Sequence, residues 1–141
     1  MKKILFSFVS LLIFLSLVFS TKSAESKIFG KGIQKSGGSK TDTEIKEAKT
    51  MMETIKFVLD HYKLDNGMYP TTEQNLKALV KKTTAPPLPN NWRGKYLGRI
   101  PRDPWGRPYN YVCPGAYNKN SYDLSSYGPD GVESQDDITN W

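Results

Sequence analysis

The stretch TDTEIKEAKTMMETIKFVLDHYKLDNG, residues 41–67, predicts one long helix and with it the fold class. Its apolar side chains recur at alternating steps of three and four residues, which places them on one face of an α-helix. They are Ile45, Ala48, Met52, Ile55, Leu59 and Tyr62. A capping box at Thr41 to Glu44 begins the helix, and Asn66-Gly67 ends it. We expect this apolar face to pack on a sheet of the same domain, although such a stripe can also form a seam with a partner helix.

A second, shorter helix is predicted for Glu73 to about Lys82, with Thr71 or Thr72 as its N-cap. The stretch from Ala85 to Pro89 then forces an extended loop, because proline fixes its own φ and restricts the residue before it. A short strand is expected after this loop, built from Trp92, Tyr96 and Leu97.

Two antiparallel strands are predicted where tyrosines alternate with small residues, at 108–112 and at 122–127. A loop over residues 114–120 joins them. Ahead of them, Asp103-Pro104-Trp105-Gly106 has the residues that a type I turn prefers. Helices that precede strands along the chain are typical of an α+β domain rather than of repeated βαβ units.

The charge distribution divides the chain into three segments. The whole sequence holds 20 basic and 14 acidic side chains, a net charge of +6, but residues 42–141 hold 13 of each. Residues 1–24 are predicted to be a signal peptide or a short apolar anchor, because a basic start precedes the apolar run Ile4–Phe19. Residues 25–41 form a flexible basic linker, and residues 42–141 form the globular domain. A neutral domain argues against nucleic-acid binding. We therefore expect an exported, periplasmic protein, which contacts the inner membrane only if the apolar run is retained.

Enzymatic chemistry finds little support in the residue pattern. Cys113 is the only cysteine and His61 the only histidine, and they lie far apart in the sequence. Cys113 is expected to be a small apolar side chain on a strand, and His61 a solvated residue off the buried face of the helix. No glycine-rich phosphate loop and no serine elbow is present. We therefore predict that the protein is not an enzyme.

The C-terminal segment carries the one candidate site. From Asp123 to Trp141 there are five acidic residues and no basic one. Carboxylates held in a short loop repel one another unless solvent or a cation intervenes, and calcium prefers such hard oxygen ligands. The residues leave two interpretations open, a calcium loop and a Pro-Asp-Gly turn with a solvated acidic tail. A catalytic pair at Asp136 and Asp137 is disfavoured, because adjacent carboxylates rarely straddle a substrate.

A succession of motifs resembles a known family. YKLDNGMYP at 62–70 runs into TTEQNLKALV, and IPRDPWGRPYNYVCPG, YDLSSYGPDG and DDITNW follow in order. Together they are similar to the C-terminal domain of the major pseudopilin of the type II secretion system, called general secretion pathway protein G. The resemblance covers about residues 42–141. It implies a pilin-like fold in which a long N-terminal helix and a short second helix pack on a three-stranded antiparallel sheet with a C-terminal calcium-type loop.

The resemblance also implies a cofactor and its ligands. Carried over by position, calcium would be held by the side chains of Asp130, Asp136 and Asp137. The backbone carbonyls of Tyr127 and Ser134 would complete the site. From the loop itself we add that calcium should stabilise the domain, because it would bind the ordered loop and hardly at all the unfolded chain.

The function that the resemblance implies is structural. The protein would be an assembly component related to the type II secretion pseudopilus, aiding export of folded proteins, with other pseudopilins, secretion-system proteins and exported cargo as partners. The alternative is a freestanding, calcium-stabilised binding module outside a pilus. One departure bears on this choice: the sequence lacks the Gly-Phe-Thr-Leu-x-Glu start of a prepilin helix.

Overall fold

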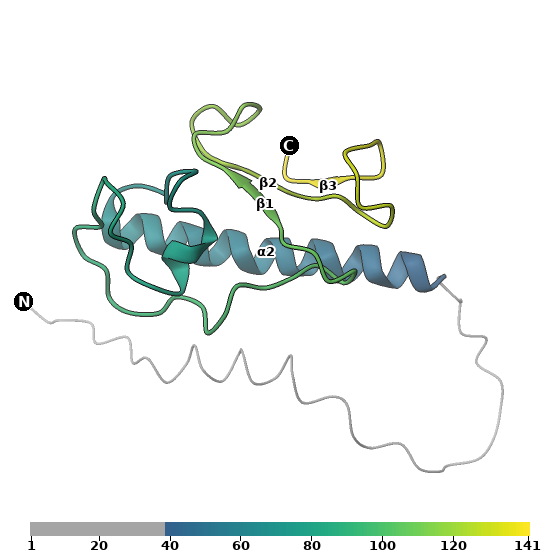
Figure 1. The fold of residues 1–141 in the computed structure, drawn as a ribbon, viewed down its shortest axis with the longest axis horizontal. Coiled ribbons are helices and arrows are strands. Elements are labelled where there is room, and N and C mark those ends of the chain that lie inside the picture. Colours follow the sequence, from purple (N-terminus) through teal and green to yellow (C-terminus); the bar gives the residue numbers. More distant parts are fainter. Residues whose placement is uncertain (1–38) are drawn as a thin grey trace, which may run out of the picture. The chain divides into compact units, whose positions relative to one another are not determined.

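The computed structural model describes residues 39–141, so the predicted leader at 1–24 and most of the linker at 25–41 lie outside the described residues (Figure 1). The domain consists of the helix α2 (Lys40–Asn66), the short 3-10 helix η1 (Leu76–Leu79) and three strands. These strands are β1 (Asn110–Val112), β2 (Asp123–Ser126) and β3 (Ile138–Thr139). Within this part of the chain, no helix is long and apolar enough to cross a membrane.

The long helix is confirmed, with a different N-cap. Ser39 caps α2: its hydroxyl accepts from the Asp42 amide at 3.2 Å, and the Asp42 carboxylate accepts from the Ser39 amide at 2.8 Å. The predicted capping box at 41–44 is therefore wrong by two residues. At the other end Gly67 adopts a left-handed conformation with φ of 81° and donates its amide to Lys63, as a glycine C-cap requires.

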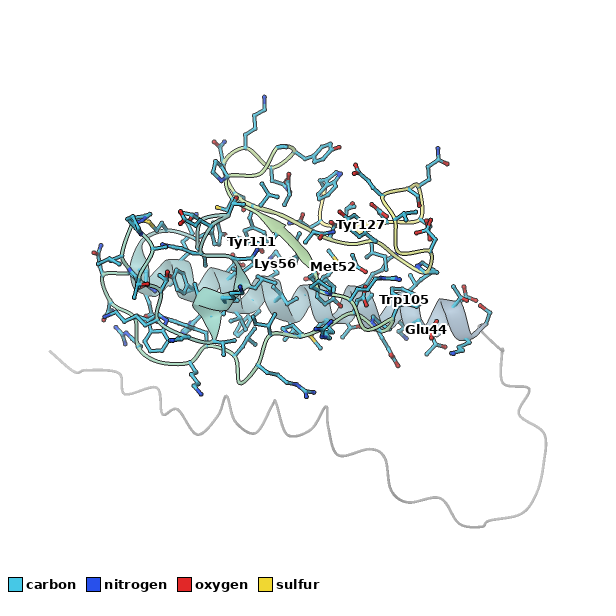
Figure 2. All side chains as sticks on the ribbon, viewed as in Figure 1. Glu44, Met52, Lys56, Trp105, Tyr111 and Tyr127 are labelled. Atoms are coloured by element: carbon cyan, nitrogen blue, oxygen red, sulfur yellow. The ribbon has the colours of Figure 1, made fainter. Side chains whose placement is uncertain are left out.

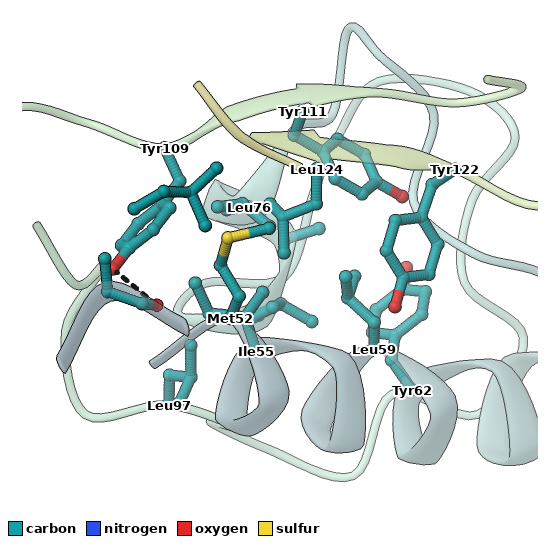
Figure 3. Close-up of a cluster of buried hydrophobic side chains, with 14 residues drawn as sticks. Met52, Ile55, Leu59, Tyr62, Leu76, Leu97, Tyr109, Tyr111, Tyr122 and Leu124 are labelled. Atoms are coloured by element: carbon teal, nitrogen blue, oxygen red, sulfur yellow. Dashed lines mark hydrogen bonds between the residues drawn. The ribbon is translucent and has the colours of Figure 1, made fainter. Parts of the chain in front are cut away.

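The core lies between one face of α2 and the sheet, with η1 beside it (Figure 3). Five of the six residues of the predicted stripe are buried, and Ile45 packs at the margin. The sheet contributes Tyr111 and Leu124, each at most 3% exposed. The Tyr111 hydroxyl donates to the Pro70 carbonyl at 2.7 Å, and burial raises the pKa of Tyr111 far above its ordinary value. The apolar face of the helix thus packs within its own domain, as predicted.

The three-stranded antiparallel sheet has the order β1-β2-β3. Tyr111 pairs with Leu124 across the first ladder, and Ser126 pairs with Ile138 across the second. The strand expected at Trp92, Tyr96 and Leu97 does not form. The amides of Tyr96 and Leu97 both donate to the Leu79 carbonyl, so this segment is tied to η1 at one point and no ladder can develop.

The second helix is much shorter than the predicted Glu73–Lys82. Asn75 has a φ of 53°, which an α-helix cannot accommodate, and only the 3-10 turn of η1 follows it. Ahead of Asn75, the Thr71 hydroxyl accepts from the Gln74 amide, and the Gln74 side chain accepts from the Thr71 amide. The Gln74 side-chain amide also donates to the carbonyls of Ala85 and Pro87. The segment is therefore a compact loop fastened through Gln74.

Candidate functional site

The segment that joins β2 to β3 is an exposed acidic loop, residues 127–137. It carries Asp130, Glu133, Asp136 and Asp137 and no basic residue. Tyr127, at its start, and Trp105 both lie toward the end of α2 that carries Glu44 (Figure 2). The loop therefore projects from the sheet at one end of the domain.

Inside the acidic loop, Ser134 connects two of the predicted metal ligands. Its hydroxyl donates to the Asp136 carboxylate, and its amide donates to the Asp137 carboxylate at 3.3 Å. The Ser134 hydroxyl, helped by a hydrogen bond with the Asp130 side chain, holds the pKa of Asp136 below its ordinary value. The Tyr127 carbonyl accepts from the Gly131 amide at 3.1 Å. The structure thus brings Asp130, Ser134 and Asp136 together, with Asp137 turned toward the Ser134 backbone.

Glycine is required at the base of the acidic loop. Gly128 has a φ of 59°, and a Cβ added to it would lie 2.6 Å from the Asp136 carbonyl oxygen. Gly131 has a φ of 78° and lies against the Arg107 guanidinium. Both positions need the left-handed region that glycine adopts without steric cost. The two glycines therefore allow the loop to fold back on itself.

A buried carboxylate anchors this loop from the DPWG turn. The turn forms as predicted, with the Gly106 amide donating to the Asp103 carbonyl at 2.9 Å. The Asp103 carboxylate accepts from the amides of Trp105 and Arg107 at 3.1 and 2.7 Å and from the Ser126 hydroxyl at 2.7 Å. Its side chain is fully buried, and the Arg107 Nε lies 3.6 Å from it.

Arg107 links the buried Asp103 carboxylate to the acidic loop. Its guanidinium donates to the Gly128 carbonyl and lies over the Trp105 ring, 5.6 Å from the centroid. Asp103 and Arg107 thus join the turn, the end of β2 and the loop. The sequence predicts only the turn. The tertiary contacts of Asp103 and Arg107 leave no pattern in the neighbouring residues from which they could be predicted.

Asp123 belongs to a different part of the structure from the other acidic residues. It is 6% exposed, and its carboxylate accepts from the amides of Tyr117 and Asn118, both at 2.9 Å. Burial acts to raise the pKa of Asp123, but these backbone donors outweigh it and the pKa lies below its ordinary value. Asp123 therefore orders the loop at 114–120 and is not a ligand of the candidate site.

The lowered pKa of Asp123 predicts a pH dependence of stability. A carboxylate whose pKa is lower in the folded state stabilises the fold above its unfolded pKa of about 3.9, and that stabilisation is lost as the pH falls through the folded value. We expect the Asp123→Asn variant to lose less stability between pH 5 and pH 3 than the parent. Urea unfolding across this range measures the difference, with the exposed Glu47→Gln as control. Parallel pH profiles for parent and Asp123→Asn would contradict it.

The donor chemistry of the acidic loop suits a hard cation, but its side chains are not arranged as a closed metal site. Within residues 39–141, no three carboxylate, imidazole or thiol groups come close enough together to enclose a metal ion.

The remaining candidate residues have structural roles. Cys113 is half-buried just after β1 rather than on it, and its thiol lies 3.7 Å from the Ser121 carbonyl. Burial raises the pKa of the Cys113 thiol, opposite to an activated nucleophile. His61 is exposed, as predicted, with its ring 6.0 Å from that of Tyr96. Trp141 stacks on Tyr117, with ring centroids 4.4 Å apart.

Comparison with known proteins gives a consistent result. The family model described as type II secretion system (T2SS), protein G, matches residues 35–141. The type II secretion system core protein G of Dickeya chrysanthemi is 48% identical over 106 residues, covering 74% of this chain and 68% of that protein. Its counterpart from Pseudomonas aeruginosa is 50% identical over 99 residues, covering 67% and 68%.

A solved structure shares the fold. The crystal structure of the major pseudopilin from the type 2 secretion system of enterohaemorrhagic Escherichia coli superposes with a TM-score of 0.64 at 44% identity. The match covers 70% of this chain and 87% of that one. Sequence and structure therefore agree over most of the described domain.

Proposed function

Since the chain belongs to the family of type II secretion system protein G, we infer that it is a structural component of the pseudopilus that serves protein secretion. The observation that carries this function is the family match over residues 35–141, joined to the pilin-like fold of the solved pseudopilin. The match includes the long helix, the sheet and the acidic loop. A freestanding binding module is not favoured, because the whole described domain is shared with secretion proteins. The relatives of this chain are structural secretion components rather than known enzymes.

Secretion in a deletion strain tests this function. Removing the gene is expected to leave proteins that normally cross the outer membrane inside the periplasm, and the full-length chain supplied in trans should restore their release. The measurement is the fraction of a secreted protein found in the medium, with a purely periplasmic protein as the leakage control. Unchanged release from the deletion strain would refute a role in secretion.

We propose a location and partners in keeping with this family membership. As a component of the secretion pseudopilus, the chain assembles with other secretion-system components. We place the folded domain in the periplasm, in contact with other pseudopilins and exported cargo, and attached to the inner membrane if residues 1–24 are retained. The intact mass of the purified protein tests the attachment. Loss of about 20 N-terminal residues would exclude anchoring by the apolar run.

Calcium is proposed as the ion of the acidic loop. Asp130, Asp136 and Asp137 would supply carboxylate oxygens, and Tyr127 and Ser134 would supply carbonyl oxygens, in keeping with the hard ligands calcium prefers. Two features support the proposal: Ser134 holds the Asp136 and Asp137 carboxylates beside it, and the loop follows a tight path through two left-handed glycines. Bound there, calcium would neutralise repulsion within the loop and favour its folded conformation.

Calcium is therefore expected to raise the unfolding temperature. At about 100 times its dissociation constant, a ligand of the folded state alone contributes about 2.7 kcal/mol, and each kcal/mol raises the midpoint by about 4–8 °C in a domain of this size. Thermal unfolding with calcium and with chelator measures the shift. The double variant Asp130→Asn, Asp136→Asn should abolish it and Glu133→Gln should retain it. Coincident curves for the parent protein would end the calcium proposal.

A further inference from the structure

A second charged surface lies at the other end of the domain. Residues 74–97, called here the basic lobe, contain five basic side chains and no acidic one. All five are exposed, and they are Lys77, Lys81, Lys82, Arg93 and Lys95. The neutral charge of residues 42–141 thus conceals two separated surfaces of opposite sign.

Hydrogen bonds hold the basic lobe together as one structural unit. The Trp92 indole donates to the Ala78 carbonyl at 3.2 Å, and the Tyr96 and Leu97 amides donate to the Leu79 carbonyl at 2.8 and 2.9 Å. The segment carrying Arg93 and Lys95 is therefore fixed beside the segment that carries the other three lysines, and the five charges belong to one lobe.

The basic lobe and the acidic loop lie toward opposite ends of α2 (Figure 1). The lobe is fixed to the C-terminal end, where Arg93 pairs with Asp65 at 3.1 Å. The strand that follows the acidic loop shares a shallow groove with Lys49 and Met52, nearer the N-terminal end. These attachment points are about 20 Å apart along the helix at about 1.5 Å per residue, well beyond the screening length of about 8 Å at physiological salt.

Few internal partners neutralise either surface. The ion pairs within residues 39–141 involve none of the four carboxylates of the acidic loop, and in the basic lobe they involve only Arg93. Because the two surfaces lie apart within residues 39–141, they do not pair with each other in one copy of the domain. A second copy of this chain carries both complements.

We propose that the basic lobe of one copy binds the acidic loop of a second copy, so that copies associate head to tail. The proposal rests on the function proposed above and identifies the surfaces that a growing assembly would use. A contact between two different surfaces leaves one of each free at the ends, and it therefore extends instead of closing after two copies. An anionic membrane is a poorer match, because it offers the acidic loop no complement.

Zero-length cross-linking detects the contact directly. A carbodiimide joins a lysine amine to a carboxylate with which it is in contact, and it can be applied to the full chain in the membranes of its own host. We expect dimers and longer ladders, with linked peptides that join the lysines of the lobe to the carboxylates of the loop. Mixing isotope-labelled and unlabelled chains identifies links between molecules. Links from the lobe lysines to other carboxylates, without any to the acidic loop, would overturn the proposal.

Two charge variants test the surfaces separately. The lobe variant, Lys81→Glu with Lys82→Glu, removes most of the positive charge of the basic lobe. The loop variant, Glu133→Lys with Gln135→Lys, changes the loop charge but none of the carboxylates proposed to hold calcium. Each alone is expected to lower the dimer yield about tenfold or more, since like charges at a contact repel. The control Lys46→Glu with Lys119→Glu makes the same change in net charge as the lobe variant, but at positions outside both surfaces, and should retain the yield.

Mixing the two variants gives the sharpest outcome. Each variant retains one native surface, so the loop of the lobe variant can still bind the lobe of the loop variant. Dimers of mixed composition should return, while ladders beyond two copies should not. No return of dimers would refute the head-to-tail pairing, as would a loss of cross-links in the control equal to that in the variants.

Measuring secretion alongside cross-linking distinguishes a failure of this proposal from a failure of the function on which it rests. A deletion strain that secretes normally refutes the proposed function, whatever the cross-links show. A strain that needs the chain for secretion, but in which neither variant alters cross-linking, supports the function and overturns the charge contact. Equal binding of the parent and the loop variant to anionic vesicles, lost in the lobe variant, together with unchanged dimer yields, would assign the lobe to the membrane instead.

Discussion

Replacing Asp103 with alanine is expected to lower the free energy of unfolding by about 3–5 kcal/mol, because three donors lose their buried acceptor at a cost of about 1–3 kcal/mol each. The Asp103 carboxylate accepts three hydrogen bonds, from two amides of its own turn and from the Ser126 hydroxyl, and lies beside the Arg107 guanidinium. Alanine would leave these donors without their acceptor and Arg107 without a counter-charge. A loss of this size is a large part of the stability of an ordinary domain.

Urea unfolding of the parent and the Asp103→Ala variant measures this effect. Glu47→Ala is the matched control, because it also removes a carboxylate but from an exposed position on α2; we expect it to change stability by about 0.5 kcal/mol at most. The Asp103→Asn variant distinguishes the hydrogen bonds from the charge. Its amide oxygen can still accept from the turn amides, but it offers Arg107 no negative charge. A loss below about 1 kcal/mol for alanine would show that the turn and Arg107 do not depend on this carboxylate.

Replacing Leu59 with alanine is expected to cost about 2–5 kcal/mol of unfolding free energy, because truncating a buried leucine loses its transfer free energy and leaves a cavity. Leu59 is completely buried in the middle of the face that α2 turns toward the sheet. The neighbouring side chains are held by the helix and by the hydrogen-bonded strands. They can therefore close little of the cavity, so a value in the upper half of this range is expected.

Thermal or urea unfolding checks the Leu59→Ala prediction, and Phe57→Ala serves as the control on the same helix. Phe57 is the larger side chain, but it is 61% exposed on the opposite face. We expect its truncation to change stability by about 0.5 kcal/mol or less. Equal losses for the two variants would mean that the outer face of α2 is covered in solution and that Phe57 is buried there.

The parts of the fold that local periodicity determines could be predicted from sequence. The buried face of α2 follows from spacing alone, and Gly67 ends the helix because only the left-handed conformation fits there. The N-cap was harder, since two overlapping candidates, Ser39 and Thr41, each have an acidic residue three positions later. The stronger capping preference of serine over threonine agrees with the observed choice.

Elements fixed by tertiary contacts could not be predicted in the same way. Residues 73–82 have helical spacing, but the left-handed Asn75 interrupts them and Gln74 fastens the segment to a loop more than ten residues away. The expected strand around Tyr96 fails for a similar reason, because its amides are used at η1. In both cases a long-range hydrogen bond outweighs the local preference.

The candidate site was predictable in composition but not in geometry. The excess of acidic residues from Asp123 onward is plain in the sequence. Which of them order a neighbouring loop and which lie in the acidic loop is not. Asp123 serves the loop at 114–120, and Arg107 reaches the acidic loop from more than twenty residues earlier in the chain. Calcium binding by the loop stays a prediction, and its ligand set rests on the family resemblance.

The length of α2 bears on how the domain withstands force. The helix has 27 residues, about 40 Å at about 1.5 Å per residue, and the core contacts are distributed along most of it. A pull or push applied at Ser39 along the helix axis would therefore load many side-chain contacts at once, in shear. Strands that are peeled apart break one pair at a time, whereas these contacts must slide together. A force applied along the axis of α2 would thus be passed to the whole core of the domain.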